Sequence, residues 1–118
     1  MESPKISRIL HESGAISDEI DWNLAKFLLA ERGTGYVPCC ASLVELEGGT
    51  QSIRLQIDFT AVEEDGVYGY GNMEKGFVGE LFADLQGNVI WCTPLEEMER
   101  RRDELIATVQ PGKRPHHY

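Results

Sequence analysis

The stretch that decides the fold is Ile53-Arg54-Leu55-Gln56-Ile57-Asp58-Phe59-Thr60-Ala61, in which apolar and polar residues alternate along the whole length. Neighbouring side chains of a β-strand point to opposite faces of a sheet. One face of this segment would therefore carry the apolar side chains, and the other face the polar ones. The pattern predicts an antiparallel strand with one face on the core and one face in water.

Further strands are predicted on both sides of this segment. Residues 36–46 are rich in Val, Leu and Cys, and Glu47-Gly48-Gly49-Thr50 is a hairpin signal that follows them directly. Shorter strands are expected at residues 67–71, 77–85 and 89–92. The connections between strands are too short for βαβ crossovers, so the pattern indicates an antiparallel meander.

Two helices are predicted before the sheet. Ser3-Pro4 is a helix start signal, and the apolar residues that follow it predict a short first helix that ends at Gly14. Ser17 would cap a longer second helix that ends at Gly33. The second helix carries two apolar stripes: Ile20, Leu24, Phe27 and Leu28 in one, and Trp22, Ala25 and Leu29 in the other. Such a wide apolar face predicts contact with the sheet and with a second element.

A last helix is predicted after the sheet. Thr93-Pro94-Leu95-Glu96 has the residue types of a capping box, and Pro111-Gly112 would end the helix. The expected fold is therefore α+β: an antiparallel meander sheet of about four to five strands, flanked by two N-terminal helices and one C-terminal helix. We expect a single domain over residues 1–110 and a flexible C-terminal tail over residues 111–118.

Charge is the compositional feature with functional content. The 118 residues carry a net charge of −9, with 18 acids and 6 bases in residues 1–99 against 2 acids and 5 bases in residues 100–118. Acidity of this kind opposes binding to nucleic acid or to an anionic membrane and favours a partner protein with a basic surface. It is also explained by solubility alone. No secretory signal or long apolar run is present, which predicts a cytoplasmic protein.

The three cysteines, Cys39, Cys40 and Cys92, are an odd number, and two of them are adjacent. Adjacent side chains on a strand point apart, so we expect free and partly buried thiols with no disulfide. His11, His116 and His117 are not spaced with these cysteines as metal-ligand pairs. We predict no metal site, no cofactor and no catalytic residue from the motifs.

Polar side chains of the sheet form the first candidate site. The set is Arg54, Gln56, Asp58, Glu80 and Asp84. If the sheet curves around this set, it becomes a pocket in which a carboxylate serves as a general base. If the sheet is flat, the set is a solvated face.

A tyrosine group forms the second candidate site. Tyr68 and Tyr70 would share one strand face beside several acids, namely Glu63, Glu64, Asp65 and Glu74. Exposed tyrosines among acids suit a protein-binding surface that faces a basic partner. The alternative is that both tyrosines pack on the core, with the intervening glycine at a bulge or turn.

Three classes of function follow from these features. The first, which we favour, is a non-enzymatic protein-binding domain, an inhibitor or adaptor that engages a basic partner. In size, acidity and layout the chain resembles small bacterial immunity and anti-defence proteins, a likeness of general design that rests on no motif. The second is a small-ligand-binding domain or enzyme whose curved sheet encloses a pocket with one or two carboxylates. The third is a subunit of a homodimer or larger homo-oligomer.

Overall fold

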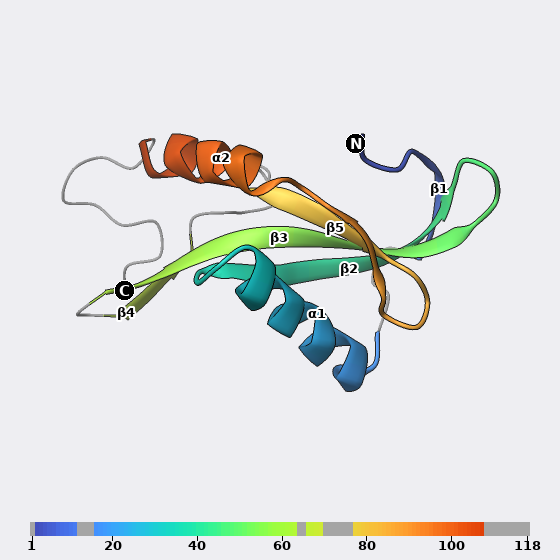
Figure 1. Cartoon of the computed structure of the whole chain (residues 1–118), viewed down its shortest axis with the longest axis horizontal. Helices are drawn as coiled ribbons and strands as arrows, with labels where there is room; N and C mark the ends of the chain where they lie inside the picture. Colours follow the sequence, from blue (N-terminus) through green and yellow to red (C-terminus); the bar gives the residue numbers. More distant parts are fainter. Residues whose placement is uncertain (1, 12–15, 64–65, 70–76, 108–118) are drawn as a thin grey trace.

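The computed structural model describes residues 2–11, 16–63, 66–69 and 77–107. It is an α+β structure with an antiparallel sheet and two helices, which confirms the predicted class (Figure 1). The predicted tail at residues 111–118 lies outside the described residues. In chain order the elements are β1 (Ile6–His11), α1 (Asp18–Glu31), β2 (Tyr36–Leu46), β3 (Gln51–Glu63), β4 (Gly66–Gly69), β5 (Gly79–Ala83), β6 (Val89–Cys92) and α2 (Leu95–Ala107).

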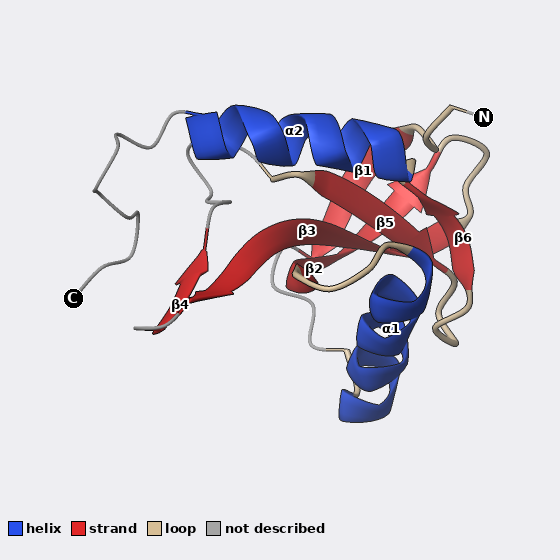
Figure 2. Ribbon diagram, turned by 60° about the vertical axis from the view of Figure 1, so that its left-hand side comes forward, coloured by secondary structure: helices blue, strands red, loops and turns tan. Residues whose placement is uncertain are grey.

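The sheet is antiparallel at every pairing, with strands in the order β1-β2-β3-β5-β6. Strand β4 lies outside this order and pairs with the last four residues of β3. Figure 2 shows β3 curving away from the rest of the sheet to end beside β4. In a simple meander β5 would pair with β4. It pairs instead with the first half of β3, so the predicted simple meander is interrupted at β4.

The predicted first helix is wrong, because this segment forms strand β1. Ile6 lies opposite Leu46, and Ile9 lies opposite Val44, at the edge of the sheet. The apolar spacing of so short a segment fits either structure, and β-branched residues such as isoleucine suit a strand. Pairing with β2, more than 30 residues away, therefore decides the conformation of β1.

The predicted second helix is confirmed as α1. The Ser17 hydroxyl accepts a hydrogen bond from the Ile20 amide at 3.2 Å, as an N-cap does. Leu24 and Leu28 are buried, and Gly33 follows the helix with a φ of +108°. A glycine with positive φ is a common helix terminator because it has no side chain to clash with its own backbone.

The alternation of residues 53–61 is confirmed over the residues whose burial the structure describes. Ile53, Leu55 and Ile57 are buried on one face of β3, and they join Leu24 and Leu28 of α1 and Met98 of α2 in one core cluster. Because these residues form one cluster, both helices pack on the same face of β3, with α1 in contact with β2 and α2 in contact with β5. Arg54, Gln56 and Asp58 point to the opposite face and are half-buried.

The predicted capping box at Thr93 does not form. The Thr93 side chain is buried, and its hydroxyl accepts a hydrogen bond from the Glu80 amide at 2.9 Å. The helix begins two residues later, at Leu95, and the Pro94 carbonyl accepts its first hydrogen bonds, from Glu97 and Met98. Thr93 thus ties the end of β6 to β5 and does not cap α2.

Candidate functional site

The structure brings together part of the predicted polar group on the sheet. Arg54 of β3 and Glu80 of β5 form an ion pair in which Nε and Nη2 of Arg54 both lie 2.8 Å from one carboxylate oxygen, Oε2. Gln56 lies directly opposite Glu80 in the strand register. About a quarter of each charged side chain is exposed, so the pair lies at the surface, on the face of β3 opposite the core residues.

The other two predicted acids have local roles. Asp58 Oδ1 accepts a hydrogen bond from the neighbouring Phe59 amide at 2.7 Å. Asp84 lies in the turn between β5 and β6, where its carboxylate accepts hydrogen bonds from the amides of Gln86 and Asn88 and from the Asn88 side chain, at 2.9–3.0 Å. These bonds, with those of Asn88 foremost, hold the pKa of Asp84 below its usual value. Asp84 therefore stabilises a turn.

Glu80 also lines a surface cleft of about 510 Å³ that the sequence did not predict. The lining comes from the segment before β1, from β5 and β6, and from the start of α2; it comprises Glu2, Ser3, Lys5, Glu80, Trp91, Thr93, Pro94, Glu97 and Arg101. Both signs of charge are present, and Glu97 pairs with Arg101 at 3.1 Å. Three separate chain segments build this cleft, around residues 2–5, at residue 80 and over residues 91–101, so no local pattern in the sequence could have indicated it.

The predicted tyrosine group falls largely outside the described residues, as Glu64, Asp65, Tyr70 and Glu74 do. Tyr68 lies in β4 opposite Ala61, and Glu63 closes the hairpin opposite Gly66. The protein-binding role of these tyrosines and acids stays a prediction.

The adjacent thiols do not point apart as predicted. Sγ of Cys39 and Sγ of Cys40 lie 3.5 Å from each other, because the register of β2 shifts between Pro38 and Cys40. Burial, together with the hydrogen bond between the two thiols, raises the pKa of Cys39 to about 11. The thiol of Cys39 is therefore protonated at neutral pH, which makes it a weak nucleophile. Among the described residues no group of three His, Cys, Asp or Glu side chains could hold a metal ion.

The outward face of α1 carries two large exposed apolar side chains. Trp22 is 65% exposed and Leu29 is 60% exposed, on the opposite side of the helix from the buried Leu24 and Leu28. The sequence predicted that this second stripe would contact another element. In the described part of the chain the stripe faces solvent instead.

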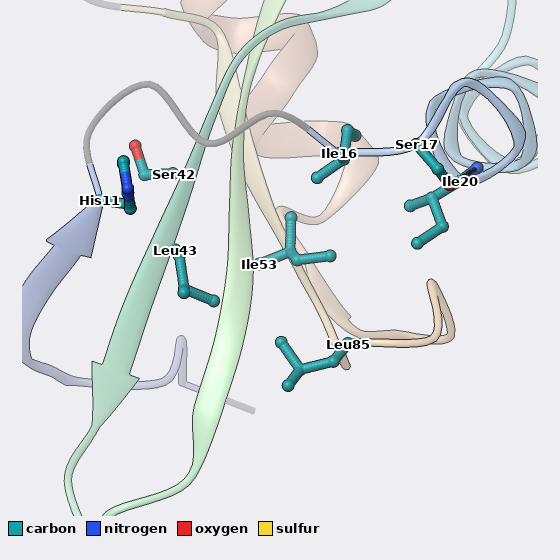
Figure 3. A pocket seen from close by; sticks show the side chains of 8 residues that line it. All are labelled: His11, Ile16, Ser17, Ile20, Ser42, Leu43, Ile53 and Leu85. Carbon is teal, nitrogen blue, oxygen red and sulfur yellow. Dashed lines mark hydrogen bonds between the residues drawn. The ribbon is translucent and has the colours of Figure 1, made fainter.

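A second hollow lies beside the first turn of α1 (Figure 3). Its volume is about 270 Å³, and apolar side chains predominate among the residues that line it: His11, Ile16, Ser17, Ile20, Ser42, Leu43, Ile53 and Leu85. They come from the end of β1, the start of α1, the neighbouring strands β2 and β3, and the turn after β5. None of these residues was in the predicted sites, because only the tertiary structure brings them together.

Comparison of the chain with protein-family models, with curated proteins and with solved structures finds no match. Neither of the helices in the described ranges is long and apolar enough to cross a membrane.

Proposed function

We propose that this chain is a non-enzymatic protein-binding domain whose outward α1 face binds a basic amphipathic segment of a partner protein. The observation that carries the proposal is the exposure of Trp22 and Leu29 in one stripe of α1. Contact between water and apolar side chains of this size is unfavourable. A partner that covers them removes this contact, which favours binding. Tryptophan is also enriched among the residues that dominate binding energy at protein interfaces.

The spacing of the stripe suits a helical partner. Trp22, Ala25 and Leu29 follow the i, i+3, i+7 pattern, which places them along one line on the helix surface. The line is about 10 Å long, because a helix rises about 1.5 Å for each residue. Two turns of an amphipathic helix could lay their apolar side chains along it.

The charge around the stripe selects a basic partner. Asp18, Glu19 and Asp21 lie in the first turn of α1 and Glu31 ends it, against a single base, Lys26, so the helix has four acids and one base. All four carboxylates are exposed. Lysine or arginine side chains flanking the apolar residues of a partner would pair with these carboxylates and speed the encounter.

A direct test uses two synthetic amphipathic helices with the same leucine pattern, one with lysines and one with glutamates on the polar face. The full chain is labelled with ¹⁵N and titrated with each peptide. We expect the lysine peptide to bind, with amide shifts centred on α1, and the glutamate peptide not to bind. Affinity should fall as salt rises, since exposed charges are screened within about 10 Å at 0.1 M salt.

Matched leucine variants locate the binding face. Leu29→Ala should weaken binding of the lysine peptide by about tenfold or more, as truncation of a central interface residue does. Leu95→Ala removes an exposed leucine from α2 and should leave the affinity unchanged. Equal losses in both variants, or shifts spread evenly over the acidic surface, would show that the peptide binds by charge alone and would refute the proposal.

A second copy of the chain is the other possible occupant of this face. The net charge of −9 opposes such self-association, because two acidic surfaces repel each other. Sedimentation velocity measures this directly. A dimer that dissociates in the Leu29→Ala variant would replace the basic partner with a homodimer as the function of this face.

A further inference from the structure

We infer that the hollow beside the first turn of α1, which we call the α1 pocket, binds a small neutral aromatic molecule with one hydrogen-bonding group. This site lies on a different part of α1 from the proposed protein-binding stripe. Ile20, which lines the pocket, is on the side of the helix that carries Leu24 and Leu28, whereas Trp22 and Leu29 are on the outward side. The inference therefore does not depend on the proposed function.

The pocket arises from the way in which α1 meets the sheet. In Figures 1 and 2 the last turn of α1 lies closer to the sheet than the first turn. Leu24 and Leu28 fill the space beneath the later turns. Beneath the first turn, Ile20 packs against the turn between β5 and β6, where a Cβ added at Gly87 would lie 3.3 Å from the Ile20 side chain. The strands β2 and β3 form the floor of the remaining space.

The lining of the pocket is divided into an apolar part and a polar end. Ile16, Ile20, Leu43, Ile53 and Leu85 form the apolar part. Figure 3 shows His11 and Ser42 side by side at the other end. An occupant therefore needs an apolar body, and one group that exchanges a hydrogen bond with the His11 imidazole.

Volume sets the size of the occupant. Apolar cavities of about 150 Å³ bind benzene, and sites for drug-sized ligands begin at about 300 Å³. The α1 pocket, at about 270 Å³, lies between these values. One aromatic ring with one or two substituents fits this range.

Charge excludes the ionised alternatives. The chain carries a net charge of −9, which disfavours an anionic molecule. A cationic group would have to be buried among apolar side chains, because no carboxylate is among the described residues that line the pocket. A neutral molecule such as a phenol meets both conditions.

The test is a titration of the full chain, with ¹³C-labelled isoleucine and leucine methyl groups, against p-cresol, and separately against toluene and p-toluate. We expect saturable shifts at the five apolar lining residues, with a dissociation constant for p-cresol of about 1 mM or lower. Toluene, which has the same ring without the hydroxyl, should bind about fivefold more weakly, the ratio expected for one neutral hydrogen bond. p-Toluate should bind most weakly.

Three variants decide whether the shifts report this site. Ile16→Phe fills the pocket and should weaken p-cresol binding by about tenfold or more, whereas Ile90→Phe, at an exposed isoleucine of β6, should not change it. His11→Leu should remove the preference for p-cresol over toluene and leave toluene binding unchanged. This result does not depend on Ile16→Phe folding correctly.

The following outcomes would overturn the inference. They are shifts that rise without saturation, shifts at residues away from the pocket, or an unchanged preference for p-cresol in His11→Leu. Leu29→Ala should bind p-cresol like the unmodified chain, so a failure of the protein-binding proposal would be visible separately.

Discussion

Arg102 of α2 donates a hydrogen bond from Nη1 to the phenol oxygen of Tyr36 at 3.2 Å, which joins two residues 66 positions apart in the chain. The central carbon of the same guanidinium, Cζ of Arg102, lies 5.7 Å from the centre of the Phe59 ring. The centres of the Tyr36 and Phe59 rings lie 5.3 Å apart. Three side chains, from β2, β3 and α2, therefore close the core at the end where β2 begins. The contact attaches α2 to the sheet away from its buried Met98.

Tyr36→Phe should lower the free energy of unfolding by about 1–2 kcal/mol, because the substitution removes the buried acceptor of a charged donor. Urea denaturation of the variant and the unmodified chain measures the difference. The double-mutant cycle with Arg102→Met should give a coupling energy of at least about 0.5 kcal/mol, as directly contacting residues do. Additive effects in the cycle would show that the hydrogen bond contributes nothing to stability.

The same tyrosine should make stability fall at high pH. Burial raises the pKa of Tyr36 above its ordinary value of 10.0, an effect larger than the opposite effect of the nearby Arg102 charge. The folded chain then holds the phenol proton more tightly than the unfolded chain, so stability is lost as the pH rises above 10.0. The unfolding free energy of the unmodified chain should therefore decline relative to that of Tyr36→Phe above this pH. Parallel pH profiles for the two chains would contradict the assignment.

Gly35→Ala should destabilise the chain more than Gly33→Ala. Both glycines have a positive φ, +99° and +108°, in which an alanine is strained. At Gly35 the added Cβ would also lie 2.7 Å from the Phe59 ring and 2.9 Å from the Thr60 carbonyl oxygen, whereas at Gly33 nothing lies within 4 Å. We expect a loss of about 1–2 kcal/mol at Gly33 and of at least about 3 kcal/mol at Gly35. Thermal or urea unfolding of the two variants measures both values, and equal losses would show that the Phe59 ring moves aside freely.

Leu28→Ala and Leu29→Ala separate the two faces of α1. Leu28 is fully buried, so its truncation leaves a cavity and should cost about 2–5 kcal/mol. Leu29 is mostly exposed, and its truncation should change stability by less than about 0.5 kcal/mol. The two free energies of unfolding are obtained from urea titrations. A large loss for Leu29→Ala would mean that this side chain is packed within the chain and is not available to a partner.

Cys39 should react slowly with iodoacetamide, although Cys39 is exposed to solvent. A pKa of about 11, against the ordinary 9.0, lowers the thiolate fraction at neutral pH about 100-fold. Mass spectrometry of the alkylated peptide gives the rate. Cys40→Ala removes one of the groups that raise this pKa, and it should speed the reaction at Cys39. A rate at Cys39 that matches free cysteine in the unmodified chain would contradict the raised pKa.

Local patterns in the sequence determined the elements that have a strong period or a clear start signal. The alternation at residues 53–61 predicted the faces of β3, since each side chain of a strand takes the face opposite to that of its neighbour. Ser17 and the apolar stripe after it predicted α1, because the cap and the buried leucines agree with each other. The alternation also placed Arg54 and Asp58 on the face opposite the core, where Arg54 pairs with Glu80; this face is half-buried at both residues and not in open water as predicted.

Long-range pairing decided what these local patterns left open. Residues 6–11 fit a helix or a strand, and only the free edge of β2 made them a strand. Thr93 has the residue type of a helix cap, but its hydroxyl bonds to the backbone of β5. The exposed stripe of α1, the cleft beside Glu80 and the α1 pocket likewise depend on which segments meet. The spacing of apolar residues along a chain indicates which side chains of an element are buried. Contacts between distant segments decide which surfaces remain exposed when the chain has folded.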